Sequence, residues 1–116
     1  MPEYENVLMN WVKEHNILAR FSSGFEASLT EYSKEEPEEY YEWIGKYDQI
    51  PILTLDKVSY NCNFGGTKDL ESPDCLGITI SLVGNINLDD GYLGWYKEVF
   101  LIDGSLVDED FVIDRI

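Results

Sequence analysis

Two stretches of alternating apolar and polar residues constrain the possible folds of this chain most strongly. In Val58–Phe64 and again in Leu76–Leu82, apolar side chains occupy every second position. A period of two puts successive side chains on opposite faces of a β-strand. Residues 67–74 between the two stretches are polar and are expected to form a surface loop. The two stretches are therefore predicted to pair as antiparallel neighbours in one sheet.

Three turn signals follow the second stretch, at Gly84-Asn85, Asp90-Gly91 and Asp103-Gly104. Beyond the second signal lie two runs rich in β-branched and aromatic residues, Trp95–Ile102 and Leu106–Ile113. Asp-Gly between two apolar runs is a strong hairpin signal, because both residues tolerate the left-handed backbone of a tight turn. The two runs are predicted to be further strands.

The N-terminal half is expected to contain a helix and a short hairpin. An apolar stripe at helical spacing predicts a helix over Pro2–His15, with Asn16 as its C-terminal stop. The arms Ile17–Phe21 and Phe25–Thr30 then flank the turn residues Ser22-Ser23-Gly24. Because the second arm alternates with a period of two, these segments are interpreted as a hairpin.

A second helix is predicted over Ser33–Asp48. Ser33 and Glu36 have the spacing of a capping box, and Pro37 lies in the first turn, where its missing N–H is tolerated. One face of this helix is apolar and consists of Tyr40, Trp43, Ile44 and Tyr47. The other face is acidic with one aromatic residue and consists of Glu35, Glu38, Glu39, Tyr41 and Glu42.

These elements predict an α+β fold in which an antiparallel sheet of about five or six strands packs against two helices. The chain of 116 residues is expected to be a single compact domain, residues 1–116. The 23 acids and 8 bases give a net charge of −15, shared between residues 1–50 (11 acids, 4 bases) and residues 51–116 (12 acids, 4 bases). Direct nucleic-acid binding is therefore not expected, because phosphate contacts need a basic patch.

The sequence contains no secretory leader pattern and no apolar run long enough to cross a membrane. Cys62 and Cys75 are accordingly interpreted as reduced thiols of a cytoplasmic protein, although a cross-strand disulfide between them is geometrically conceivable. Two cysteines and one histidine are too few ligands for a structural zinc site. No cofactor or metal is expected.

No catalytic motif is present, and the chain is predicted not to be an enzyme. His15 is the only histidine, and it falls on the inward side of a helix end, where a packing role is expected. No serine lies in a nucleophile elbow. The acidic groups near Asp69, Asp89 and Asp108 lack the spacing of a calcium loop and are interpreted as solvated loops.

The acidic face of the second helix is the predicted partner-binding site. Its central glutamates lack neighbouring cations four residues away and should repel one another, while Tyr41 supplies an aromatic anchor. Acidic residues elsewhere are expected to extend the contact. The predicted partner-binding set is Glu35, Glu38, Glu39, Tyr41, Glu42, Asp89, Asp90, Asp108, Glu109 and Asp110. A merely solvated helix face is the alternative interpretation.

In size, acidity and small α+β build, the chain resembles bacterial immunity proteins, which neutralise a cognate toxin that is often a nuclease. The resemblance implies an inhibitor that covers the basic, phosphate-binding surface of its partner. A phage-encoded DNA mimic that blocks a DNA-binding defence enzyme is the main alternative. A small enzyme with a buried carboxylate pair in a cleft, and a structural domain of a larger assembly, are further alternatives.

Overall fold

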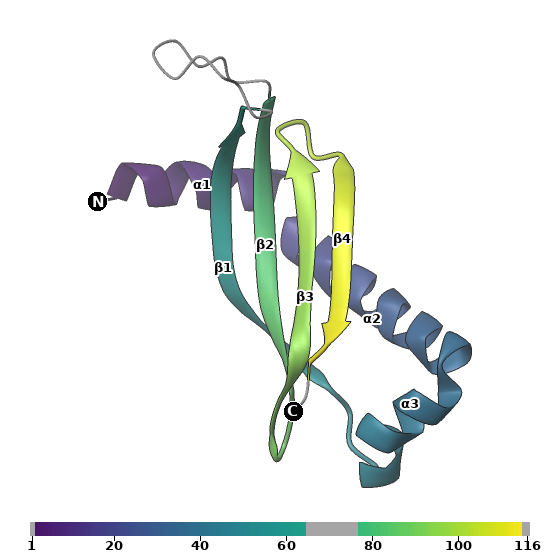
Figure 1. The fold of residues 1–116 in the computed structure, drawn as a ribbon. Helices are drawn as coiled ribbons and strands as arrows, with labels where there is room; N and C mark the ends of the chain where they lie inside the picture. Colours follow the sequence, from purple (N-terminus) through teal and green to yellow (C-terminus); the bar gives the residue numbers. More distant parts are fainter. Residues whose placement is uncertain (1, 65–76, 115–116) are drawn as a thin grey trace.

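The computed structural model describes residues 2–64 and 77–114 and is α+β, with helices first and a sheet second (Figure 1). The helices are α1 (Pro2–Glu14), α2 (Ile17–Glu35), α3 (Pro37–Trp43) and the 3₁₀ turn η1 (Gly45–Tyr47). The strands are β1 (Ile52–Asn63), β2 (Gly77–Leu88), β3 (Gly91–Leu101) and β4 (Leu106–Ile113).

The strands form one antiparallel meander in the order β1-β2-β3-β4. The predicted pairing of the two alternating stretches is confirmed, since Val58 of β1 lies opposite Leu82 of β2. The prediction of five or six strands is wrong, because the described residues contain four. One reason is that Gly84 does not start a turn. It lies inside β2, where the side chain of Leu53 and the backbone of Thr54 leave little room for a Cβ atom.

The predicted hairpin over 17–30 is wrong, because the whole segment belongs to the 19-residue helix α2. The buried side chains of α2 are Ile17, Phe21 and Phe25, which are spaced by four residues and therefore share one helix face. Ala27, which gave the second arm its period of two, is exposed. The spacing of four therefore outweighed the local alternation.

The predicted helix over 33–48 is also divided differently. Ser33 lies inside α2, where its hydroxyl donates to the carbonyl of Thr30 at 2.6 Å and does not cap a helix. Pro37 opens the short helix α3, as expected from its place in a first turn. The chain then passes through η1 into β1.

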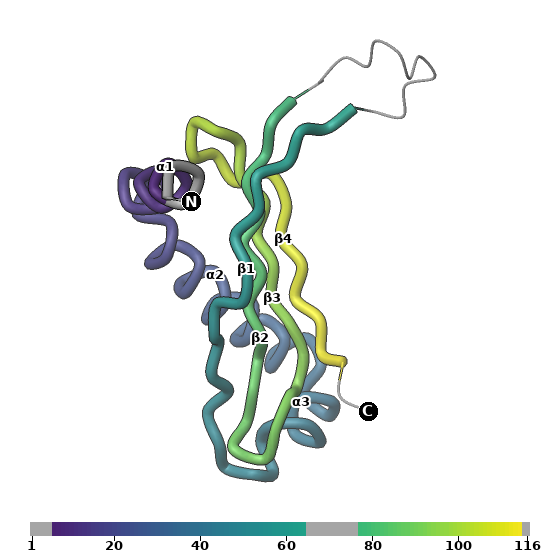
Figure 2. The backbone as a smooth tube through the Cα atoms, turned by 90° about the vertical axis from the view of Figure 1, so that its left-hand side faces the viewer, coloured from purple at the N-terminus to yellow at the C-terminus, as the bar shows by residue number. Residues whose placement is uncertain are grey.

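The helices cover one face of the sheet, as the side view in Figure 2 shows for α1. The core lies in this layer, and its buried side chains come from α1, α2, β2 and β3 and from Ile44 between α3 and η1. Its largest fully buried side chains are Tyr96, Phe100, Ile17 and Ile44. The expected inward side of the acidic helix is confirmed in part: Ile44 is fully buried and Tyr40 and Trp43 are half-buried, whereas Tyr47 is exposed.

The first helix ends as predicted. Asn16 takes the left-handed conformation (φ 54°) between α1 and α2, and the Trp11 indole N–H donates to the carbonyl of Ile102 at 2.6 Å. His15 packs against Gly104, whose φ of +92° suits glycine in the β3–β4 turn. The histidine is therefore a packing residue at a helix end, as the sequence indicated.

Cys62 is disulfide-bonded, so its interpretation as a reduced thiol is wrong. Disulfides persist mainly in oxidising compartments, so one ground for the cytoplasmic assignment is lost and that assignment stays a prediction. Cys75, the loop 67–74 and its acidic group around Asp69 lie outside the described residues. Within the part of the chain that is described, no helix combines the length and the apolar character needed to cross a bilayer.

Candidate functional site

The C-terminal end of α2 and the helix α3 together form an acidic surface beyond the β4 side of the sheet (Figure 1). We call this surface the acidic corner and define it as Glu31, Glu35, Glu36, Glu38, Glu39, Tyr41 and Glu42, all of them exposed. Tyr41 is 62% exposed, so a large aromatic ring stands among the carboxylates. Five of the predicted contact residues therefore lie together.

An aromatic contact holds α3 against α2 beneath the acidic corner. The rings of Tyr32 and Tyr40 meet edge to face with centroids 6.0 Å apart, and Tyr32 also packs on Phe111 of β4 at 5.5 Å. The Tyr32 hydroxyl is buried and has no hydrogen-bond partner among the residues that the structure describes. Burial, together with the charges of Glu39 and Glu36, raises the pKa of Tyr32 to about 12. The negatively charged side chains of the acidic corner are therefore carried by helices that pack through aromatic side chains.

The repulsion expected among the glutamates is present in part. The exposed Glu31 carboxylate raises the pKa of Glu35, because the two acids face each other four residues apart on α2. The expectation that no cation relieves these charges is wrong for Glu42, which forms an ion pair with Lys46 at 2.8 Å. In the described part of the chain, Glu35, Glu38 and Glu39 form no ion pair.

A structural role competes with a binding role for two of these acids. Glu38 and Glu39 lie in the first turn of α3, where a negative charge stabilises the helix through its dipole. No comparable structural role accounts for the position of Tyr41. Its ring is mostly exposed, and burying it against a partner would gain apolar contact at low entropic cost.

The other predicted contact residues do not join the acidic corner. Asp89 and Asp90 form the β2–β3 turn, which is tied to the segment after η1 because the Asp89 N–H donates to the Gln49 side chain at 3.0 Å. Asp108 and Asp110 lie on the sheet face opposite the helices, since they alternate with Glu109 along β4. The ten residues therefore do not form one continuous surface.

Glu109 instead belongs to a cluster on the helix side of the sheet that the sequence analysis missed. The Tyr96 hydroxyl lies 2.5 Å from Oε2 of Glu98 and 2.9 Å from Oε2 of Glu109. Tyr96 is fully buried, Glu98 is 2% exposed, and Glu109 is exposed at the sheet edge. The sequence pattern could have revealed this cluster. Glu98 is two residues from both Tyr96 and Phe100 in a predicted strand, so its side chain is on the same inward face as theirs.

Burial dominates the electrostatics of this cluster. It raises the pKa of Glu98, and the Glu109 charge raises it further, whereas the Tyr96 hydroxyl and the Arg20 charge act in the opposite direction. Burial also raises the pKa of Tyr96. The second oxygen of Glu98, Oε1, is buried and accepts no hydrogen bond from residues 2–64 or 77–114.

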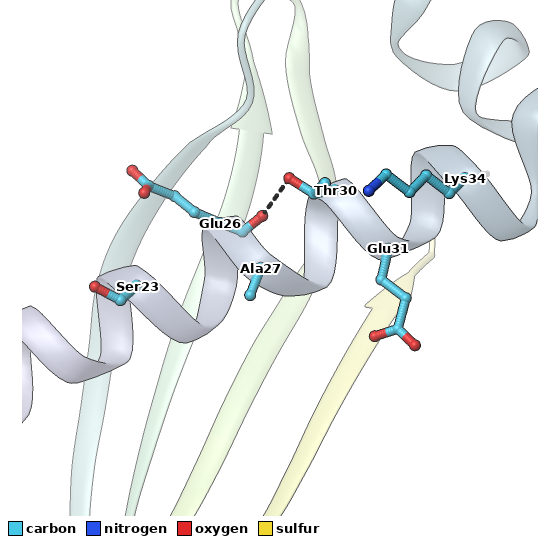
Figure 3. A pocket seen from close by; sticks show the side chains of 6 residues that line it. All are labelled: Ser23, Glu26, Ala27, Thr30, Glu31 and Lys34. Atoms are coloured by element: carbon cyan, nitrogen blue, oxygen red, sulfur yellow. Dashed lines mark hydrogen bonds between the residues drawn. The ribbon is translucent and has the colours of Figure 1, made fainter.

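Two surface depressions of the described residues are lined by residues other than this carboxylate pair. One is a shallow, open depression on the outer side of α2, lined by Ser23, Glu26, Ala27, Thr30, Glu31 and Lys34 (Figure 3). Its two acids point to different sides, and Thr30 donates its hydroxyl proton to the carbonyl of Glu26 at 3.0 Å. Another depression lies near Asn16. Among the described side chains, no three potential metal ligands gather at one point.

Comparison with known proteins gave no match: no family model matches the chain, and neither a curated protein nor a solved structure matches it. Functional inference therefore rests on the geometry and charge of this chain.

Proposed function

We propose that this protein is a binding module that inhibits a basic protein, and that the acidic corner carries the central contacts. The observation that carries the proposal is the exposed ring of Tyr41 among carboxylates of which Glu35, Glu38 and Glu39 form no ion pair within the described residues. We propose a nuclease-type toxin as the partner, with the protein acting as its immunity protein.

The physical argument begins with the partner. A nuclease must be basic where it meets phosphate, so a surface of carboxylates can occupy the same place. The net charge of −15 attracts such a partner over a distance and speeds its association. Charge alone gives little specificity, so an anchor is needed. Tyr41 provides one, because tyrosine buries a large ring while its hydroxyl can still form a hydrogen bond.

A DNA mimic that blocks a defence enzyme is the second candidate, and the same acidic corner supports it. The two candidates differ in the number of partners. An immunity protein should bind one toxin, whereas a DNA mimic should bind several unrelated DNA-binding proteins. The genes that neighbour the coding sequence separate them as well, since a toxin gene supports the first and a phage operon the second.

The proposal is tested by affinity capture from a lysate of the native host, followed by mass spectrometry. Three forms of the protein are immobilised: the wild type, E38Q/E39Q in the acidic corner, and the control E14Q/D56N. Both variants lose two negative charges, but Glu14 and Asp56 lie on α1 and β1, away from the corner. Wild type and control should retain the same basic protein, and E38Q/E39Q should retain clearly less of it.

Glutamine keeps the helix propensity of α3, and circular dichroism checks that the variants fold. Equal retention of the partner by wild type and E38Q/E39Q would remove the acidic corner from the binding site. Retention of an acidic protein would contradict the proposed class of partner.

A further inference from the structure

The cluster of Tyr96, Glu98 and Glu109 has too few protons for its contacts when both carboxyls are ionised. The Tyr96 hydroxyl has one hydrogen, yet its oxygen lies within hydrogen-bond distance of both carboxylates. If the hydrogen goes to Glu98, the contact with Glu109 brings two acceptor oxygens together without a proton between them. One additional proton on either carboxyl resolves this conflict, because the protonated carboxyl can donate to the tyrosine oxygen.

Among the described residues, no cation forms an ion pair with Glu98, although the charge of Arg20 is close enough to lower its pKa. Arg20 is the cation of α2 on this side, but its guanidinium lies over the ring of Phe100, 5.0 Å from the centroid, and donates to the carbonyl of His15 at 3.5 Å. It forms no ion pair with Glu98 within the described residues. The neighbour of Glu98 on β2 is the apolar Leu82, and its neighbour on β4 is the acid Glu109.

Helix α2 covers the cluster on the helix side of the sheet. A Cβ atom at Gly24 would collide with the Glu98 carboxylate and would lie 2.5 Å from the Tyr96 hydroxyl. The helix backbone therefore lies directly on the two side chains. The cluster is part of the contact between α2 and β3, so its charge state acts on that contact.

We propose that the Glu98 carboxyl of the Tyr96–Glu98–Glu109 cluster holds a proton, and that release of this proton as the pH rises weakens the docking of α2 on the sheet. Ionised Glu98 would be buried and would face the exposed Glu109 across Tyr96, and its Oε1 atom has no donor within the described part of the chain. Water must then enter to solvate the charge, and separation of α2 from β3 would admit it, because the helix backbone lies directly on the Glu98 carboxyl. The contact between α2 and β3 would thus be sensitive to pH. This property is separate from the proposed binding function.

The sign of the pH effect follows from linkage. The folded protein holds its proton to a higher pH than the unfolded chain does, because the pKa of Glu98 is raised on folding. The stabilisation that comes from protonated Glu98 is therefore complete below the ordinary glutamate pKa of about 4.5. It is lost as the pH rises through the pKa of Glu98 in the folded protein. The cluster opposes the usual gain in stability that carboxylates show as the pH rises from acid.

The test compares thermal unfolding midpoints of wild type, E98Q and E26Q between about pH 5 and pH 8.5. E98Q removes the titrating carboxyl but keeps its shape and supplies donors. E26Q removes the same charge from the exposed outer side of α2 (Figure 3), so it controls for relief of the overall charge. The midpoint of wild type and E26Q should fall relative to that of E98Q by several degrees as the pH rises.

Amide hydrogen exchange in α2 locates the effect. At high pH the amides around Gly24 should exchange faster in wild type than in E98Q at the same pH. A ¹³C NMR titration of the Glu98 carboxyl in the wild type gives an independent reading should E98Q fail to fold, and its pKa is expected above the ordinary value. Parallel pH profiles for E98Q and E26Q, or an ordinary or lowered pKa for Glu98, would overturn the proposal.

Discussion

Gly24 occupies the middle of α2, where glycine destabilises a helix by about 0.5–1 kcal/mol relative to alanine. Its value lies in the tertiary contact, because the missing Cβ lets the helix backbone approach Tyr96 and Glu98. The same residue explains an error of interpretation. Ser22-Ser23-Gly24 resembles a turn in the sequence, whereas glycine serves close packing there.

Substitution of Gly24 by alanine should therefore destabilise the protein despite the better helix propensity of alanine. Overpacking of this kind typically lowers the free energy of unfolding by about 1–3 kcal/mol. Denaturant unfolding of G24A measures it, with S23A on the exposed side of the same turn as the matched control. S23A should be neutral or slightly stabilising. A G24A variant as stable as S23A would contradict the close approach.

The candidate site was predictable in part at this scale. Tyr41 and its neighbouring glutamates were assigned to an exposed face from spacing alone, and each of them is exposed. The Lys46–Glu42 pair is four residues apart and was readable in the sequence. The contact between Glu98 and Glu109 needs the register of β3 against β4, which local pattern does not specify.

Among the elements, the strands were predicted better than the helices. The last strand, Leu106–Ile113, has the expected bounds, because an Asp-Gly turn and an uninterrupted run mark it. β1 and β2 begin or end well outside the predicted stretches, since pairing extends strands through residues of weak propensity such as Asn85. Helix α2 was missed because its buried residues are spaced over nine positions at intervals of four, while a local alternation of period two covers six positions.

Helix α1 depends on the β3–β4 turn for its position, and the indole of Trp11 is the polar part of that connection. Replacement by phenylalanine keeps a large apolar ring but removes the hydrogen bond to Ile102. We expect W11F to lower the free energy of unfolding by about 1 kcal/mol, the usual net value of one hydrogen bond. Thermal and denaturant unfolding check this. A W11F variant with unchanged stability would show that packing alone holds α1.

At the scale of the whole molecule, the acidic groups of the described residues lie mostly outside the core, and the buried carboxyl of Glu98 is an exception. The helices and one sheet face enclose the apolar side chains, and the junction of α2 and α3 carries the acidic corner outside that layer. Self-repulsion at a net charge of −15 lowers the stability of a compact state, so this distribution has an energetic cost that a purely structural domain would not need.

The most direct test of the central claim is the association rate constant of the captured partner, measured against ionic strength for wild type, E38Q/E39Q and Y41A. The wild-type rate should fall by about tenfold or more from low to high salt, because salt screens the attraction between the acidic corner and a basic partner. E38Q/E39Q should show a shallower dependence, and Y41A should keep the wild-type dependence but dissociate faster. The same salt dependence for E38Q/E39Q and wild type, with unchanged dissociation of Y41A, would contradict the assignment of the acidic corner as the recognition surface.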